Sequence, residues 1–153
     1  MLIEKVCNQL TKKKIPFAVV GGYAVALHGA VRGTIDLDLV IKLSQQTFEN
    51  IEIALKEIGF ESRLPVRAKE VFQFREEYIE NRNLIAWSFY NPHNLSEIVD
   101  IIITHNLDDM KYVKKRSGKL QIPIVAIDDL INMKKLTGRE QDKADIKSLE
   151  KLK

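Results

Sequence analysis

The chain has 153 residues, of which 45% are hydrophobic and 29% are charged. This composition is typical of one folded, soluble domain and excludes disordered, collagen-like and low-complexity proteins. The net charge of +3 is too small to indicate a polyanionic partner by itself. The single cysteine, Cys7, cannot form an internal disulfide, and we expect it to be structural. Because there is no targeting segment and no apolar run of about 18 residues, we expect a cytoplasmic protein with no membrane contact.

The first 30 residues predict a helix, a strand and a second helix. Apolar residues at helical spacing predict a helix over 2–13. The apolar run 17–20 predicts a short buried strand, which Gly21 and Gly22 end sharply. Residues 23–28 are typical of a short helix directly after this turn.

Alternation between apolar and polar residues predicts a strand over 35–41. Successive side chains of a strand point to opposite faces, so Asp36 and Asp38 are expected on the same face. Ser44 is expected to cap a helix over 45–58.

The rest of the chain predicts strands and then helices. We expect strands over 60–64, 84–90, 97–103 and 121–125, and helices over 108–116, 128–136 and 140–152. The apolar residues within 66–80 fit the spacing of a helix and that of a strand equally. This order predicts an α+β fold with a mixed β-sheet flanked by helices. We expect one domain, 1–153, with a helical C-terminal segment from about 127 to 153.

Asp36 and Asp38 are unusual residues for a strand that is otherwise apolar. Two ionised carboxylates on one face repel each other and lose solvation, and a divalent cation removes both difficulties. The alternative is a half-exposed strand whose two carboxylates face water. Asp100 is a third carboxylate, alone among the aliphatic residues of the strand 97–103. If that strand neighbours 35–41, the three carboxylates converge as a two-metal site requires.

Gly21 and Gly22 precede the first aspartate, and residues 23–35 separate the two motifs. Glycine permits positive φ and close approach of a ligand to the backbone, and free N–H groups at a helix N-terminus bind phosphate. The alternative is an ordinary strand-to-helix turn, so this pair is informative only together with the aspartates.

The joint pattern resembles the nucleotidyltransferase superfamily, which has the DNA polymerase β-like fold. Its motif is a hydrophobic residue and Gly-Gly or Gly-Ser, about a dozen residues, Asp-x-Asp or Asp-x-Glu in a strand, and a third carboxylate on a later strand. The matching residues are Val20-Gly21-Gly22, Asp36-Leu37-Asp38-Leu39 and Asp100. Within the superfamily, segments 19–29, 32–38, 129–136 and 138–145 are similar to small prokaryotic AbiEii-type toxin nucleotidyltransferases.

The resemblance implies transfer of a nucleoside monophosphate from an NTP such as ATP to an acceptor hydroxyl, with release of pyrophosphate. It implies that Asp36 and Asp38 hold two Mg²⁺ ions, or Mn²⁺ in their place. Asp100 would hold the catalytic ion and lie near the acceptor hydroxyl, as a candidate general base.

The same resemblance suggests nucleotide-binding residues. Gly21 and Gly22 are expected to cradle the β- and γ-phosphates through backbone N–H groups, since Gly22 lacks the Ser hydroxyl of many members. Arg32 and Thr34 are candidate triphosphate contacts, with an exposed turn residue as the alternative for Arg32. Lys134 is a further candidate contact from the C-terminal helices, with a solvated helix lysine as its alternative.

Other conspicuous residues have structural interpretations. Ion pairs within the last helix are expected for Arg139, Asp142 and Asp145. His28 is expected to pack at a helix end, and Trp87 and Phe89 are expected in the core.

Several functions fit these residues. The acceptor of an active enzyme is a small molecule, a tRNA or a protein. A toxin-antitoxin component of the same fold would have an antitoxin partner. A non-catalytic module would bind nucleotide or partner without turnover, or would bind no metal at all.

Overall fold

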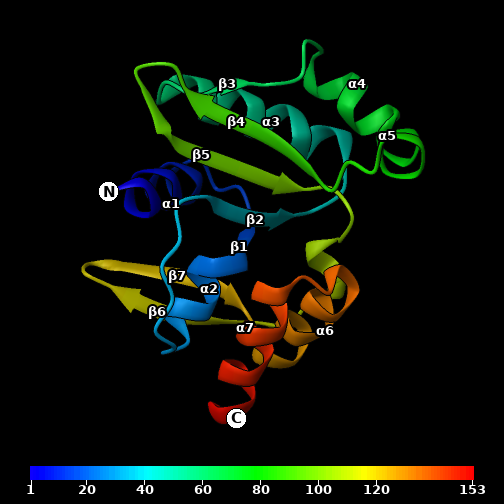
Figure 1. The fold of residues 1–153 in the computed structure, drawn as a ribbon. Helices are drawn as coiled ribbons and strands as arrows, with labels where there is room; N and C mark the ends of the chain where they lie inside the picture. Colours follow the sequence, from blue (N-terminus) through cyan, green and yellow to red (C-terminus); the bar gives the residue numbers. More distant parts are fainter.

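A computed structural model describes residues 1–153, and one mixed β-sheet runs through it (Figure 1). The helices are α1 (Leu2–Lys12), α2 (Gly21–Leu27), α3 (Gln45–Glu57), α4 (Ala68–Gln73), α5 (Arg75–Arg82), the 3₁₀ helix η1 (Leu107–Asp109), α6 (Ile127–Thr137) and α7 (Glu140–Lys151). The strands are β1 (Phe17–Val20), β2 (Leu37–Ile41), β3 (Glu61–Ser62), β4 (Ala86–Asn91), β5 (Asn94–Ile102), β6 (Tyr112–Ser117) and β7 (Leu120–Val125). The predicted α+β fold with a mixed sheet and flanking helices is confirmed. None of these helices combines the length and hydropathy that crossing a membrane requires.

The seven strands lie in the order β3-β4-β5-β2-β1-β7-β6. The pairs β2–β5 and β1–β7 are parallel, and the other neighbours are antiparallel. The strand that carries Asp38 therefore lies next to the strand that carries Asp100, the condition that a shared site requires.

One face of β2, β4 and β5 forms the hydrophobic core with α1, α3 and α4. Trp87 and Phe89 alternate with more exposed residues along β4, and both are fully buried. Phe48 of α3 stacks on Trp87 with ring centroids 5.5 Å apart. Figure 1 shows α3 behind these strands with α4 beside it, and α2, α6 and α7 gathered near β1 and β7. The opposite face of β4 and β5 is left to form the wall of a cleft.

The predicted capping residue of α3 is confirmed, because the Ser44 side chain accepts a hydrogen bond from the Thr47 N–H. Such a cap stabilises a helix by about 0.5–2 kcal/mol. The ambiguous segment 66–80 folds as α4 and most of α5. Cys7 is a buried core residue of α1, and burial raises the pKa of its thiol to about 12, so it is not an activated nucleophile.

The helix predicted over 108–116 is wrong. The segment forms η1 and then β6, an edge strand that pairs only with β7. Residues 112–116 are all exposed, so no apolar alternation marks this segment as a strand. Its lysines suit an edge strand, because charged side chains discourage pairing with another chain.

Candidate active site

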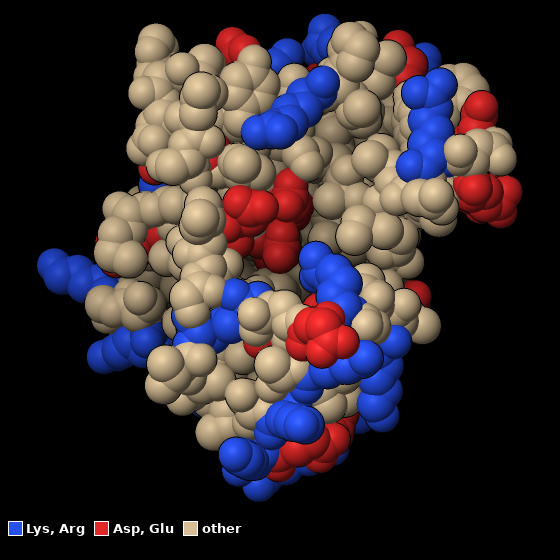
Figure 2. All heavy atoms as spheres, in the orientation of Figure 1, with Lys and Arg blue, Asp and Glu red and all other residues tan.

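A cavity of about 420 Å³ lies between the open face of the sheet and the C-terminal helices. Figure 2 shows acidic side chains gathered in a hollow near the centre of the molecule, with basic side chains close below them. The lining comes from the ends of β1 and β5, from the starts of β2 and β4, and from α6 and α7. All three aspartates of the sequence motif line it, together with Gly21 and Lys134.

Asp38 and Asp100 occupy directly opposed positions on β2 and β5. Ser88 lies opposite Asp100 on β4, and its hydroxyl donates a 2.5 Å hydrogen bond to Asp100 Oδ1. The Asp100 carboxylate is therefore held from one side and faces Asp38 from the other. Ser88 was not identified from the sequence, although it lies between the core residues Trp87 and Phe89 and so points to the open face.

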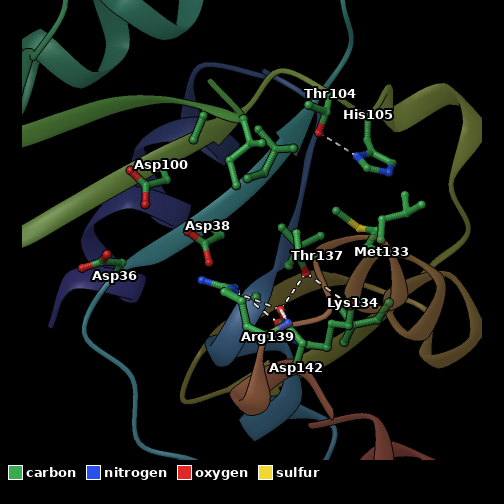
Figure 3. A pocket seen from close by; sticks show the side chains of 17 residues that line it. Asp36, Asp38, Asp100, Thr104, His105, Met133, Lys134, Thr137, Arg139 and Asp142 are labelled. Carbon is green, nitrogen blue, oxygen red and sulfur yellow. Dashed lines mark hydrogen bonds and ion pairs between the residues drawn. The ribbon is translucent and has the colours of Figure 1, made fainter. Parts of the chain in front are cut away.

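The position of Asp36 corrects the sequence prediction. The residue lies in a bend and the strand begins at Leu37. Asp36 is therefore outside the strand and is not the second residue of a strand over 35–41. Its carbonyl accepts a 3.3 Å hydrogen bond from the Thr34 hydroxyl. In Figure 3, Asp36 and Asp100 lie at one end of the cavity, with Asp38 between them and Arg139.

Crowding perturbs the carboxylates. Burial, followed by the charge of Asp100 and a hydrogen bond with it, raises the pKa of Asp38 to about 7. Burial and then Asp100 also raise the pKa of Asp36, while Arg63 acts in the opposite direction. Hard oxygen ligands that are poorly ionised when crowded together suit a divalent cation, whose charge favours their ionised form. No three Asp, Glu, His or Cys side chains converge at metal-coordinating distances in this structure.

Gly21 is packed against Asp38. Its φ is +66°, and a Cβ built on it would lie 2.0 Å from Asp38 Oδ2. A Cβ on Gly22 would lie 2.7 Å from the Thr34 hydroxyl and 3.2 Å from Arg32 Cζ. The structure therefore brings together both glycines, the Arg32–Thr34 loop and one aspartate, and only glycine fits at the first position of this turn.

Lys134 is buried, with 6% of its surface exposed, so the solvated-lysine alternative is wrong. Its Nζ lies 2.9 Å from Asp145 Oδ2 and 3.7 Å from Asp142 Oδ1. Arg32 Nε donates to the other oxygen of Asp145 at 3.0 Å, so Arg32 is not a free turn residue either. Arg32 and Lys134, which were both predicted to contact phosphate and lie far apart in the chain, thus pair with the same buried carboxylate of Asp145.

Arg139 is a cavity residue that the sequence suggested only as an ion-pair partner. The predicted pair with Asp142 is present, with distances of 2.9 Å from Nε and 3.2 Å from Nη2. Burial acts to raise the pKa of Asp142, but hydrogen bonds from Arg139 and Thr137 outweigh it and lower the pKa. The Arg139 side chain is 72% exposed, and Figure 3 shows it directed toward Asp38. The ionised Asp142 therefore holds a cation at the mouth of the acidic site.

Three residues with structural interpretations lie outside the cavity lining. His28 ends α2 and its Nε2 makes a 2.8 Å hydrogen bond with the Val125 carbonyl. Trp87 and Phe89 are fully buried on the core side of the sheet. The prediction that these three residues pack rather than bind a ligand is in accord with this placement.

The sequence model of the family Aminoglycoside-2''-adenylyltransferase matches residues 2–85, more than half of the chain. The chain belongs to this family. The matched segment includes both glycines of the turn and Asp36 and Asp38 of the acidic site. The family places the chain among the nucleotidyltransferases, as the sequence motifs predicted, and identifies it as a nucleotidyltransferase enzyme. No curated protein matches the sequence significantly.

Solved structures share the fold over nearly the whole chain. The lincomycin-bound lincosamide antibiotic adenylyltransferase LnuA superposes with a TM-score of 0.66 at 14% identity, covering 99% of this chain and 96% of LnuA. ANT(2'')-Ia in complex with adenylyl-2''-tobramycin gives 0.63 at 11% identity, with 99% and 90% covered. A nucleotidyltransferase-like protein from Paracoccidioides brasiliensis gives 0.60 at 18% identity, with 94% and 71% covered. At these identities the likeness establishes the fold.

The narrower resemblance to AbiEii-type toxins is not addressed by these matches. It stays a prediction, as does an antitoxin partner.

Proposed function

We propose that this protein transfers a nucleoside monophosphate, with ATP as the first donor to test, to a hydroxyl of a small molecule and releases pyrophosphate. The observation that carries the proposal is the opposition of Asp38 and Asp100 on adjacent parallel strands, directly against the Gly21 turn. One cavity contains carboxylates that can hold a metal, the tight turn at Gly21, the exposed Arg139 and the buried Lys134. This is the set of groups that phosphoryl-type transfer needs for positioning and charge neutralisation.

Asp36, Asp38 and Asp100 would together hold two Mg²⁺ ions, with Mn²⁺ as a substitute. The bound ions would supply neutralisation of the phosphate oxygens and of the crowded carboxylates. Asp36 would contribute its carboxylate from the bend before β2, and Asp38 from the strand itself.

The triphosphate would lie against the Gly21–Gly22 turn and bind the backbone N–H groups with which α2 begins. The missing side chains of the two glycines leave room for Asp38 and for the Arg32–Thr34 loop beside it. Arg139 is exposed beside Asp38 and would contact the phosphates directly. Arg32, Thr34 and Lys134 would form the wall behind them.

Asp100 would accept the proton of the acceptor hydroxyl as it attacks the α-phosphorus atom. Ser88 fixes the orientation of this carboxylate through its hydrogen bond, so Ser88 is a positioning residue. The bond from the α-phosphorus atom to the bridging oxygen breaks, and the pyrophosphate leaves beside Arg139 and Lys134, whose positive charge stabilises it.

The acceptor is proposed to be a small molecule because of the family and the solved structures that the chain resembles. The family is named for aminoglycoside 2''-adenylyl transfer, and the LnuA structure contains lincomycin. A tRNA or a protein acceptor is an outcome of the acceptor screen.

Calorimetric titration of each NTP in the presence of Mg²⁺ tests the proposal. We expect binding that requires Mg²⁺ and is lost in Asp38→Asn. The matched control is Asp109→Asn, because Asp109 is exposed on η1 and does not line the cavity. Binding without Mg²⁺, or equal loss in both variants, contradicts the proposal. Labelled ATP tested against aminoglycosides, lincosamides, total RNA and protein then identifies the acceptor class.

A further inference from the structure

The cavity continues beyond the acidic site, and one face of α6 runs along it. Leu130, Met133, Lys134 and Thr137 follow the spacing i, i+3, i+4 and i+7, so they form one helical stripe, and all of them line the cavity. Lys134 points to the buried Asp145 near the acidic end. The remaining length of the stripe faces a part of the cavity that the transfer chemistry does not use.

This second part of the cavity is a largely apolar compartment. The sheet side contributes Ile85, Ala86 and Ile102, and the helix side contributes Leu130 and Met133. No acidic side chain lines the compartment, since the four carboxylates of the cavity are the three proposed metal ligands and Asp142, which is paired with Arg139. The compartment therefore suits a flat, uncharged group rather than an ammonium group.

Thr104 and His105 form the polar end of this compartment, across the cavity from Asp36 and Asp100 in Figure 3. Thr104 Oγ1 and His105 Nδ1 are 2.9 Å apart, so one ring nitrogen is engaged by the hydroxyl. Burial lowers the pKa of His105, which favours the neutral imidazole. With Nδ1 engaged, the neutral ring leaves Nε2 to make one hydrogen bond, as donor or acceptor according to the tautomer, with the edge of a heteroaromatic base.

We propose that the base of the NTP lies in the apolar compartment between Met133 and the sheet, with Thr104 and His105 as the residues that recognise its edge. This inference rests on the proposed function. A single ligand that lies along α6 contacts Lys134 and Arg139 with its phosphates and His105 with its far end, and a nucleotide has this combination of a polyanion and a heteroaromatic ring. The acceptor then approaches Asp100 from the other end of the cavity.

The test compares ATP with inorganic tripolyphosphate, both titrated in the presence of Mg²⁺, in the wild type, His105→Ala and His105→Asn. We expect His105→Ala to weaken ATP binding roughly tenfold, as the loss of one hydrogen bond and its ring contact predicts, and to leave tripolyphosphate binding unchanged. The smaller His105→Asn change should recover part of the ATP affinity, because its amide can still hydrogen-bond. His93→Ala is the control, since His93 is exposed in the β4–β5 turn.

Three results overturn the inference. Equal weakening of ATP and tripolyphosphate in His105→Ala indicates that the residue acts on the phosphate site or the fold. Unchanged ATP affinity in both His105 variants places the base elsewhere, while the proposed function stands. If the wild type binds tripolyphosphate and no NTP, or binds neither with Mg²⁺, the proposed function fails as well. Thermal unfolding of each variant separates loss of binding from loss of the fold.

Discussion

Asp38 and Asp100 lie opposite one another on the parallel strands β2 and β5, although three helices and two strands separate them in the chain. Neither residue pairs with a cation at hydrogen-bond distance. Each strand places its carboxylate on the open face while its neighbours Leu37, Leu39 and Val99 fill the core. Hydrophobic packing thus holds two like-charged groups close together. A ligand that binds both carboxylates would relieve their repulsion.

Asp38 should make the stability of the metal-free protein depend on pH. Its pKa in the folded protein is about 7, above the ordinary value of 3.8. The folded state therefore binds this proton more tightly than the unfolded chain does, so its contribution is fully present below about pH 4 and is lost as the pH rises to about 7. We expect Asp38→Asn to remove this decline and to be more stable than the wild type at pH 8, by at most about 4 kcal/mol.

Urea unfolding at several pH values in the presence of EDTA measures this effect. Added Mg²⁺ should raise the free energy of unfolding of the wild type at pH 8 and leave that of Asp38→Asn nearly unchanged. A wild type whose stability is flat between pH 4 and 7, or that responds to Mg²⁺ no more than the variant, would contradict this interpretation of the carboxylate pair.

Gly21→Ala should abolish turnover by collision with Asp38. The new Cβ would lie 2.0 Å from Asp38 Oδ2, and φ is +66°. We expect a loss of about 2–3 kcal/mol of stability and of at least about 100-fold in kcat, because the metal ligand is displaced. Gly118→Ala is the matched control, since Gly118 also has positive φ (+60°) but no atom within 4 Å of its Cβ position. It should cost about 1 kcal/mol and leave turnover intact. Equal losses of turnover would show that backbone strain, and not contact with Asp38, matters.

Ser88→Ala should reduce kcat roughly tenfold with little change in KM, since removing a residue that orients a ligand typically costs 10–100-fold. The physical reason is that Asp100 loses the 2.5 Å hydrogen bond that fixes its carboxylate. Ser96→Ala is the control on the same sheet, because Ser96 is exposed and bonds only to Asn94. Steady-state kinetics with the identified acceptor measure both variants, and an unchanged kcat in Ser88→Ala would remove the positioning role.

Lys134→Met should destabilise the protein and weaken NTP binding together. Its removal leaves Asp145 and Asp142 buried with fewer partners, and breaking a buried ion pair in this way costs about 3–5 kcal/mol. Lys143→Met is the control, because its pair with Glu140 is exposed and worth less than about 1 kcal/mol. Chemical unfolding and Mg²⁺-dependent ATP titration measure the two effects. A Lys134→Met protein with wild-type stability would mean that the buried network does not hold α6 and α7 in place.

The elements with strong local signals were predictable from the sequence. The strand 17–20, the Ser44 cap and the helix after it were predicted with nearly the observed bounds, because apolar periodicity and capping chemistry act within a few residues. Non-local pairing decided the rest. β6 has exposed side chains over residues 112–116 and becomes a strand only because it pairs with β7. Asp36 falls outside β2 because its pairing with β5 begins at Leu37.

The site was predicted in its parts but not in its geometry. The spacing of the two glycines and the aspartates marked the acidic centre, and the neighbouring strands fulfilled the condition placed on Asp100. The burial of Lys134 could not be predicted, because it depends on α7 folding back against α6. The exposed guanidinium of Arg139 and the far wall at His105 follow from tertiary packing alone, which leaves no periodic signal in the sequence.

Parallel incubations with ATP labelled at the α- or the γ-phosphate, Mg²⁺ and a pool of small-molecule acceptors test the central claim most directly. We predict that the α-label enters the acceptor and the γ-label leaves as pyrophosphate, and that Asp38→Asn and Asp100→Asn stop both. Transfer of the γ-label to the acceptor, or α-label transfer that survives in both variants, would contradict nucleotidyl transfer at this trio of carboxylates.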